Sequence, residues 1–253
     1  MMRAYIDESG HEAKNWMFLA GYLGNEDQWK RFEIAWKIGL GPQRKSLHVH
    51  DLRWNHHRTK SLLERLGPIP EECGLIPILS GLRFSDYEDL VSGGPAEKLL
   101  KGWLASLQPL ILQMLRVVPN DERVEVVFEE QREYQPYANL AFTSFLAVPD
   151  HPWKRTKDGR PKIAKWSFVP KGSTIRTDPA DYLAFALREL WTDQHSKKTG
   201  WCRPILKSGA GVGKIFKRQE IRDAISRTLV LAAYRNITMQ IEEFMVRGAG
   251  NKD

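Results

Sequence analysis

Cysteine is scarce in this sequence, since only Cys73 and Cys202 occur among 253 residues. Two cysteines so far apart exclude a disulfide framework or a thiolate zinc cluster. No apolar run approaches the roughly 20 residues that cross a bilayer. The first ten residues, MMRAYIDESG, also lack the layout of a signal peptide. We therefore expect a cytoplasmic protein without membrane-spanning segments.

Acidic residues are fewer than basic ones: 31 Asp and Glu stand against 38 Lys and Arg, which gives a formal net charge of +7. The basic residues cluster within residues 56–60, 154–162, 197–198 and 207–218. A single cluster is typical of a solvated surface, but several together favour a polyanionic partner. We predict nucleic acid, DNA or RNA, as this partner, and leave a protein partner or a homodimer open.

Hydrophobic periodicity alternates between strand and helix patterns along the chain. It predicts strands over residues 3–7, 16–23, 75–84, 124–128 and 163–169. It predicts helices over residues 25–38, 60–66, 96–117, 136–148, 178–191 and 219–234. Asn25 and Asp178 are the expected caps of two of these helices, and Gly39 is the expected stop of the first. This order predicts an α/β domain with helices flanking a mixed central sheet.

The domain organisation follows from the absence of repeats and low-complexity segments. We predict one domain over residues 1–247 and a disordered tail over residues 248–253. An insertion of about residues 39–74 follows the N-terminal hairpin, and within it residues 47–50 alternate like a short strand. The polar residues 85–95 predict a loop.

Carboxylates gather where the predicted strands end and one helix begins. Asp7 ends the first strand, Glu129 and Glu130 end another, and Asp178 and Asp181 lie in the first turn of a helix. If the two strands are neighbours, their ends bring carboxylates together, and protonation or a cation must relieve the repulsion. Residues three apart on a helix can face one point. Asp178 is also typical of an ordinary helix cap.

Oxygen ligands of this kind suit Mg²⁺ or Mn²⁺, and a pair of such ions about 3.5–4 Å apart can activate water against a phosphodiester. The predicted metal ligands are Asp7, Glu129 and Asp181. The residues predicted to assist or orient are Glu8, Glu130 and Asp178. The site therefore favours phosphodiester hydrolysis.

Four histidines allow a second hypothesis. His48 and His50 would share one side of a short strand, and His56 and His57 follow closely, so a zinc or manganese site is conceivable. The alternative is that these side chains line an edge or groove of the protein, since a third ligand is missing.

Tryptophans beside basic residues could stack nucleic-acid bases. Trp54, Trp153 and Trp201 are in such positions.

Three short segments resemble a known family: YIDESG at residues 5–10, Glu129-Glu130 after an apolar strand, and Ala180-Asp181 opening a helix. Together they are similar to the domain-of-unknown-function family 3800. That resemblance extends from residue 5 to about residue 191. It implies a ribonuclease H-like fold and metal-dependent nuclease activity.

The family's acidic residues map onto Asp7, Glu8 and Asp181. Two positions depart from its pattern, because Glu129 stands where Asp is usual and Asp178 where Gln is common. The resemblance also gives Lys45 and His48 a role in contacting phosphate or transferring a proton. A nucleic-acid-binding protein without catalysis, or a toxin or defence component acting with a protein partner, is the alternative to a nuclease.

Overall fold

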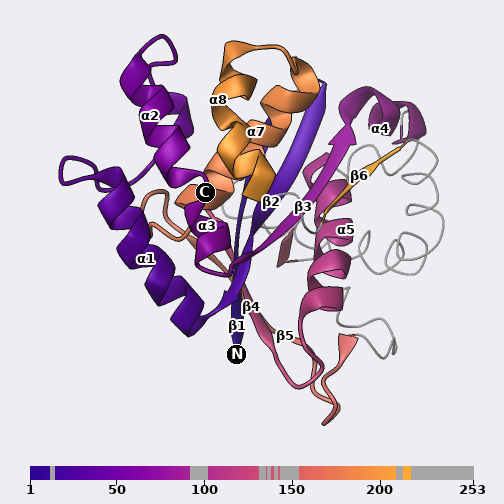
Figure 1. The fold of residues 1–253 in the computed structure, drawn as a ribbon. Coiled ribbons are helices and arrows are strands. Elements are labelled where there is room, and N and C mark those ends of the chain that lie inside the picture. The colour runs from indigo at the N-terminus through magenta and orange to yellow at the C-terminus, as the bar shows by residue number, and fades with distance from the viewer. Residues whose placement is uncertain are drawn as a thin grey trace, which may run out of the picture.

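The structure is a computed structural model that describes residues 1–11, 15–91, 102–130, 154–208 and 213–217, and four single residues between 135 and 142. Its strands form one mixed sheet in the order β5-β4-β1-β2-β3-β6 (Figure 1). The strands are β1 Met2–His11, β2 Trp16–Asn25, β3 Ile76–Arg83, β4 Val124–Glu129, β5 Ile163–Val169 and β6 Gly213–Phe216.

Strand direction divides the sheet from β5 to β3 into two parts. β2 pairs antiparallel with both β1 and β3, whereas β4 runs parallel to β1 and β5 runs parallel to β4. At the other edge, β6 runs parallel to β3. Ion pairs cross the parallel part, because Glu125 on β4 binds Arg3 on β1 at 3.1 Å and Lys165 on β5 at 2.7 Å. The central position of β1 places its side chains between the antiparallel and the parallel parts.

Helices cover both faces of this sheet (Figure 1). One face carries α1 Glu26–Leu40, α2 His57–Leu66, α3 Ile69–Glu72, α7 Asp178–Thr192 and α8 Lys197–Ser208. The other face carries α4 Phe84–Val91 and α5 Gly102–Val117. Each face has its own core of buried apolar side chains. The predicted α/β architecture with a mixed sheet flanked by helices is confirmed.

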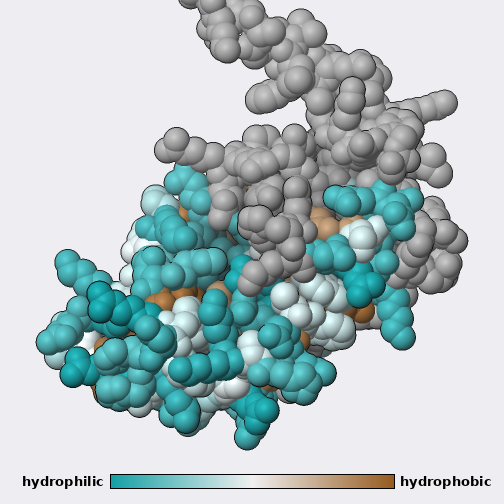
Figure 2. Space-filling view, turned by 90° about the horizontal axis from the view of Figure 1, so that it is seen from above, coloured by the Kyte–Doolittle hydropathy of each residue, from teal (hydrophilic) through white to brown (hydrophobic). Residues whose placement is uncertain are grey.

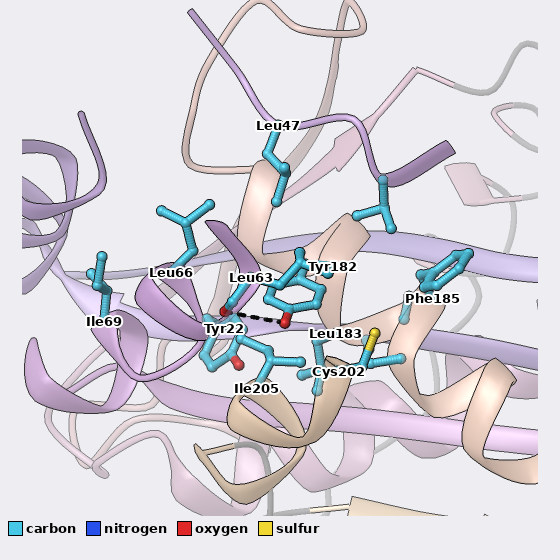
Figure 3. Close-up of a cluster of buried hydrophobic side chains, with 14 of the residues drawn as sticks. Tyr22, Leu47, Leu63, Leu66, Ile69, Tyr182, Leu183, Phe185, Cys202 and Ile205 are labelled. Carbon is cyan, nitrogen blue, oxygen red and sulfur yellow. Dashed lines mark hydrogen bonds between the residues drawn. The ribbon is translucent and has the colours of Figure 1, made fainter. Parts of the chain in front are cut away.

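α7 is the helix that positions the site. It packs across β1 and β2 and is buried along most of its length, as expected of a helix that is apolar on several sides. The Tyr182 hydroxyl lies 3.3 Å from the carbonyl oxygen of Leu63 on α2 and 3.5 Å from that of Trp201 on α8. The core in Figure 3 therefore ties α2, α7 and α8 together.

The ends of α1 partly match the sequence prediction. Asn25 caps the helix as predicted, because its side chain accepts a hydrogen bond from the Gln28 backbone, and the Gln28 side chain accepts one from the Asn25 backbone. The predicted stop at Gly39 is wrong. The helix continues to Leu40 and ends at Gly41, whose positive φ of 78° suits glycine.

Two segments differ from the sequence prediction. Residues 47–50 form no strand; Val49–Asp51 is a short 3-10 helix, η2, because nearby backbone N–H groups bond to carboxylates of α7 instead of to a neighbouring strand. The loop predicted from residue 85 is wrong for its first part, which is α4. The side chain of Asn15 accepts a hydrogen bond from the Ser85 backbone there, at 2.7 Å.

Other predictions fall outside the described residues: the helix at 219–234, most of the helix at 136–148, and the tail at 248–253. Within the described ranges, no helix is both long and apolar enough to cross a membrane.

Candidate active site

Asp7 and Glu129 lie side by side on one face of the sheet. The pairing of β1 with β4 ends at Ile6 opposite Phe128, so each carboxylate is one residue further along its strand. Both are nearly buried, with 6% and 5% of the residue exposed. The condition set in the sequence analysis is met, because β1 and β4 are neighbours. Asp7 is not at a strand end, however, because β1 continues to His11 by pairing with β2.

Asp178 and Asp181 approach the same place from the first turn of α7. Asp178 does not cap the helix as predicted; Thr177 holds the cap position. The Asp178 carboxylate instead accepts hydrogen bonds from the Trp36 indole at 2.9 Å and from the Leu47 backbone at 2.7 Å. It thereby ties α1 and the segment before η2 to α7. Burial raises the pKa of Asp178 to about 7 in spite of these hydrogen bonds.

Asp181 holds the next part of the same segment. Its carboxylate accepts a hydrogen bond from the Val49 backbone at 3.0 Å. Burial raises the pKa of Asp181, and the charge of Glu129 raises it further, whereas the Val49 hydrogen bond and the charges of Lys171 and His50 oppose the rise. The pKa of Asp181 therefore depends on both the acidic and the basic side chains of the site.

The ionisation of the Asp7 carboxylate is also opposed by its surroundings. Burial raises the pKa of Asp7 well above its usual range, and the charges of Glu8, Asp181 and Glu129 add to the rise. Asp7, Glu129 and Asp181, which come from three separate elements, thus share one electrostatic site.

The loop from β5 to α7 closes the site beside Glu129. The Glu129 carboxylate accepts hydrogen bonds from the Gly172 backbone at 3.2 Å and from the Thr177 hydroxyl at 3.5 Å, and the Lys171 ammonium lies 3.9 Å from it. Gly172 has a φ of 68°, and a Cβ built on it would lie 3.3 Å from Nε2 of His48. His48 therefore lies against this loop, close to the carboxylates.

The other predicted site residues lie further away or face elsewhere. Glu8 points to the opposite face of β1 from Asp7, because side chains alternate along a strand. Glu130 is exposed just beyond β4, where its backbone bonds to Val169 at 2.7 Å, and Lys45 is also exposed. His50 meets the edge of the Phe185 ring at a centroid distance of 5.9 Å.

The donor set suits a hard cation, but the described side chains do not form a finished metal centre. All three central donors are carboxylates, whose oxygens are the ligands that Mg²⁺ and Mn²⁺ prefer. In the part of the chain that the structure describes, no three His, Cys, Asp or Glu side chains are placed to hold a metal ion together. This observation also gives no support to a zinc site among the four histidines.

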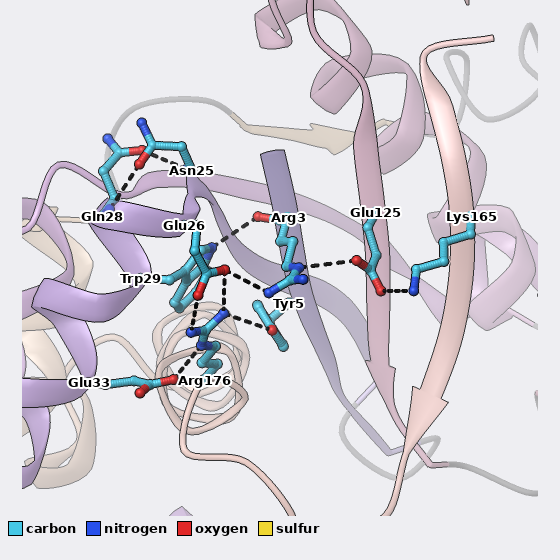
Figure 4. Close-up of polar contacts among 10 residues, drawn as sticks. All are labelled: Arg3, Tyr5, Asn25, Glu26, Gln28, Trp29, Glu33, Glu125, Lys165 and Arg176. Atoms are coloured by element: carbon cyan, nitrogen blue, oxygen red, sulfur yellow. Dashed lines mark hydrogen bonds and ion pairs between the residues drawn. The ribbon is translucent and has the colours of Figure 1, made fainter. Parts of the chain in front are cut away.

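A buried arginine that no sequence motif indicates fixes the start of α7 (Figure 4). Arg176 is only 8% exposed and donates hydrogen bonds to Glu26 and Glu33 on α1 and to the Tyr5 hydroxyl on β1. Its guanidinium also lies over the ring of Trp29 at 6.0 Å. These partners lie 143 to 171 residues away in the chain, so no local pattern signals them.

Comparison of the sequence with protein-family models and with curated proteins finds no match. The family resemblance of residues 5–10 therefore stays a prediction.

Proposed function

We propose that this protein is a metal-dependent nuclease of ribonuclease H-like fold, which hydrolyses phosphodiester bonds of DNA or RNA. The observation that carries the proposal is the grouping of buried Asp7 and Glu129 with half-buried Asp181. Removal from water, and then the charges of neighbouring carboxylates, raise the pKa values of Asp7 and Asp181. A divalent cation relieves repulsion of this kind. Mg²⁺ or Mn²⁺ is therefore the cofactor that we propose.

The sheet supports the fold part of this proposal. An antiparallel meander of β1, β2 and β3 continues into parallel β4 and β5, with helices on both faces. This is the arrangement that we expect of a ribonuclease H-like domain. The carboxylates lie on its central strands and at the start of the helix after β5.

Asp7, Glu129 and Asp181 would hold the cation, which when bound supplies an activated water and stabilises the leaving oxygen. Glu129 and Asp181 now bind the backbone groups of Gly172 and Val49, so cation binding would compete with these hydrogen bonds. Asp178 would remain a positioning residue through its hydrogen bonds to α1 and to the segment before η2. Lys171 and His48, beside Glu129, are the groups that we propose to face a phosphate.

A cleavage assay on labelled single-stranded and duplex DNA and RNA, with Mn²⁺, Mg²⁺ or EDTA, tests the proposal. We expect cleavage with either metal, none in EDTA, and a loss of more than about 100-fold in Asp7→Asn, because removing a ligand costs at least as much as removing a group that supports one. Asp27→Asn at an exposed position of α1 is the matched control, and it should cleave normally. An Asp7→Asn protein as fast as the wild type would refute the site.

A second candidate function is nucleic-acid binding without cleavage. The observation that favours it is that no three described side chains converge on a metal position. In that case the wild type would bind nucleic acid equally well in EDTA and in Mn²⁺ and would cleave none of the substrates.

A further inference from the structure

The first turns of α2 and α8 lie next to each other. The Tyr182 hydroxyl contacts the carbonyls of Leu63 and Trp201, and a Cβ built on Gly67, just after α2, would contact Pro204 on α8. Leu63 is thus level with Trp201, and Gly67, four residues later, is level with Pro204, three residues after Trp201. The two helices therefore run in the same direction with their N-terminal ends side by side.

A basic patch occupies this shared end. We define the basic patch as Arg53, His57, Arg58, Lys60, Lys197 and Lys198. Five of these residues are exposed and Lys198 is partly exposed. Where it is not grey, the face of the molecule seen from above in Figure 2 is mainly hydrophilic, with a few apolar areas.

Helix stability does not explain the positive charges. The first turns of α2 and α8 contain no acidic residue, although the positive end of the helix dipole favours acids there and disfavours lysine and arginine. Lys60 has an ion pair with Glu64 at 3.6 Å, but this pair is exposed and contributes little. An anionic ligand would relieve the repulsion.

Aromatic rings hold two of the ammonium groups in place. The Lys198 ammonium lies 5.5 Å from the ring centre of Trp54, and the Lys197 ammonium lies 4.6 Å from that of Trp201. Such contacts restrict a lysine before a ligand arrives, which lowers the entropy cost of binding. Trp201 is itself buried, so it supports a lysine and does not stack a base as the sequence suggested. Trp153 lies outside the described residues.

Packing contacts join the basic patch to the helix that carries Asp181. Phe185 is one helical turn after Asp181 on α7, a rise of about 6 Å. The Trp54 ring stacks on buried Phe185 with centroids 5.0 Å apart and an interplanar angle of 15°. Lys198, beside Trp54, is thus held near the same part of α7 as Asp181.

We propose that the basic patch binds the phosphates of a single-stranded nucleic acid whose chain continues into the carboxylate site. Exposed lysines and arginines bind phosphates, and basic surfaces with aromatic side chains among them are typical of proteins that bind single strands. Of the two rings here, Trp54 is partly exposed and Trp201 is buried. The inference rests on the proposed function for the identity of the substrate. It is nevertheless testable by binding alone, without cleavage.

The test measures the affinity for a labelled single-stranded oligonucleotide and for its duplex, in EDTA and at several salt concentrations. The variant is Lys197→Gln with Lys198→Gln, and the control is Lys30→Gln with Lys37→Gln on exposed positions of α1, which removes the same charge. We expect the patch variant to bind the single strand at least about tenfold more weakly. The slope of log affinity against log salt should fall by about 1.4, since each phosphate contact contributes about 0.7.

Equal affinities of the two double variants, both folded in a thermal melt, would overturn the inference, as would a duplex bound more tightly than the single strand. A failure of the proposed function differs from either result. In that case the patch variant would still lose binding, but the wild type would cleave no substrate with Mn²⁺ or Mg²⁺.

Discussion

At the scale of single residues, the carboxylate of Asp178 makes the stability of the fold depend on pH. It is only 3% exposed, and its carboxylate holds Trp36 and Leu47. Burial raises its pKa to about 7, so the folded protein binds a proton that the unfolded chain has released above about pH 4. The free energy of unfolding should therefore fall as the pH rises from 4 through 7, because the folded state then binds more protons than the unfolded state.

We predict that Asp178→Asn weakens this pH dependence. The amide oxygen can still accept both hydrogen bonds, but it does not titrate. In EDTA the variant should lose less stability than the wild type between pH 5 and pH 8, by as much as about 3 kcal/mol. Urea unfolding at several pH values measures the effect, with Asp27→Asn on the exposed face of α1 as a control. If the free energy of unfolding falls by the same amount with pH in Asp178→Asn and in the wild type, the prediction is contradicted.

Asp7 should also destabilise the metal-free protein. Its carboxylate is buried beside Asp181 and Glu129, and burial and their charges raise its pKa. We predict that Asp7→Asn increases the free energy of unfolding at pH 8 in EDTA by about 1 kcal/mol or more. Chemical denaturation of the wild type and the variant tests this, and a less stable variant would show that the ionised carboxylate is favourable there.

At the scale of elements, the start of α7 depends on Arg176. Its guanidinium joins the loop before α7 to α1 and β1 through Glu26, Glu33 and Tyr5. Lysine keeps the charge but cannot present donors in the same planar fork. We predict that Arg176→Lys costs about 2 kcal/mol of stability and weakens Mn²⁺ binding, because Asp181 would no longer be held in place.

The matched control for this change is Arg160→Lys, an exposed arginine that pairs locally with Asp158. In denaturant unfolding and in Mn²⁺ titration, Arg160→Lys should have nearly the same stability and the same Mn²⁺ affinity as the wild type. A stable Arg176→Lys protein with unchanged Mn²⁺ affinity would remove the positioning role of Arg176.

Much of the element pattern could be predicted from the sequence. The strands predicted at residues 124–128 and 163–169 match β4 and β5 within one residue. The buried strand β4 is a continuous apolar run, and the largely half-buried strand β5 mixes apolar with polar residues, and both are clear local signals. Residues 47–50 misled the prediction. Leu47 and Val49 alternate with histidines as in a strand, but their backbone partners are Asp178 and Asp181, over 130 residues away.

The candidate site, like the helices and strands, could be predicted from the sequence only in part. Asp7 and Glu129 could be named from the sequence as carboxylates near strand ends, but their pairing depends on β1 and β4 being neighbours, which the structure shows. Lys171, Gly172 and Arg176 could not be found in this way. Their roles arise only when the loop before α7 folds against β4 and α1, and no periodic pattern records such contacts.

At the scale of the whole molecule, the net charge of +7 should govern association with nucleic acid. Lysine and arginine contacts release counterions from phosphates, so affinity should fall steeply with salt. We predict a loss of at least about tenfold between 50 and 200 mM salt, the expected response to several phosphate contacts. Fluorescence anisotropy with a labelled oligonucleotide in EDTA measures it. An affinity that does not change with salt concentration would show that the net charge does not drive binding to nucleic acid.

If the carboxylates of Asp7, Glu129 and Asp181 hold a divalent cation, the protein binds Mn²⁺ and loses this binding when one of them is removed. Electron paramagnetic resonance of free Mn²⁺ during a titration at pH 8 measures this binding for the wild type, for Asp7→Asn and for Asp27→Asn, which changes an exposed residue of α1. We predict that the wild type and Asp27→Asn bind Mn²⁺ and that Asp7→Asn binds it at least about tenfold more weakly. Equal binding by all three proteins, or no binding by the wild type, would contradict the proposed metal site.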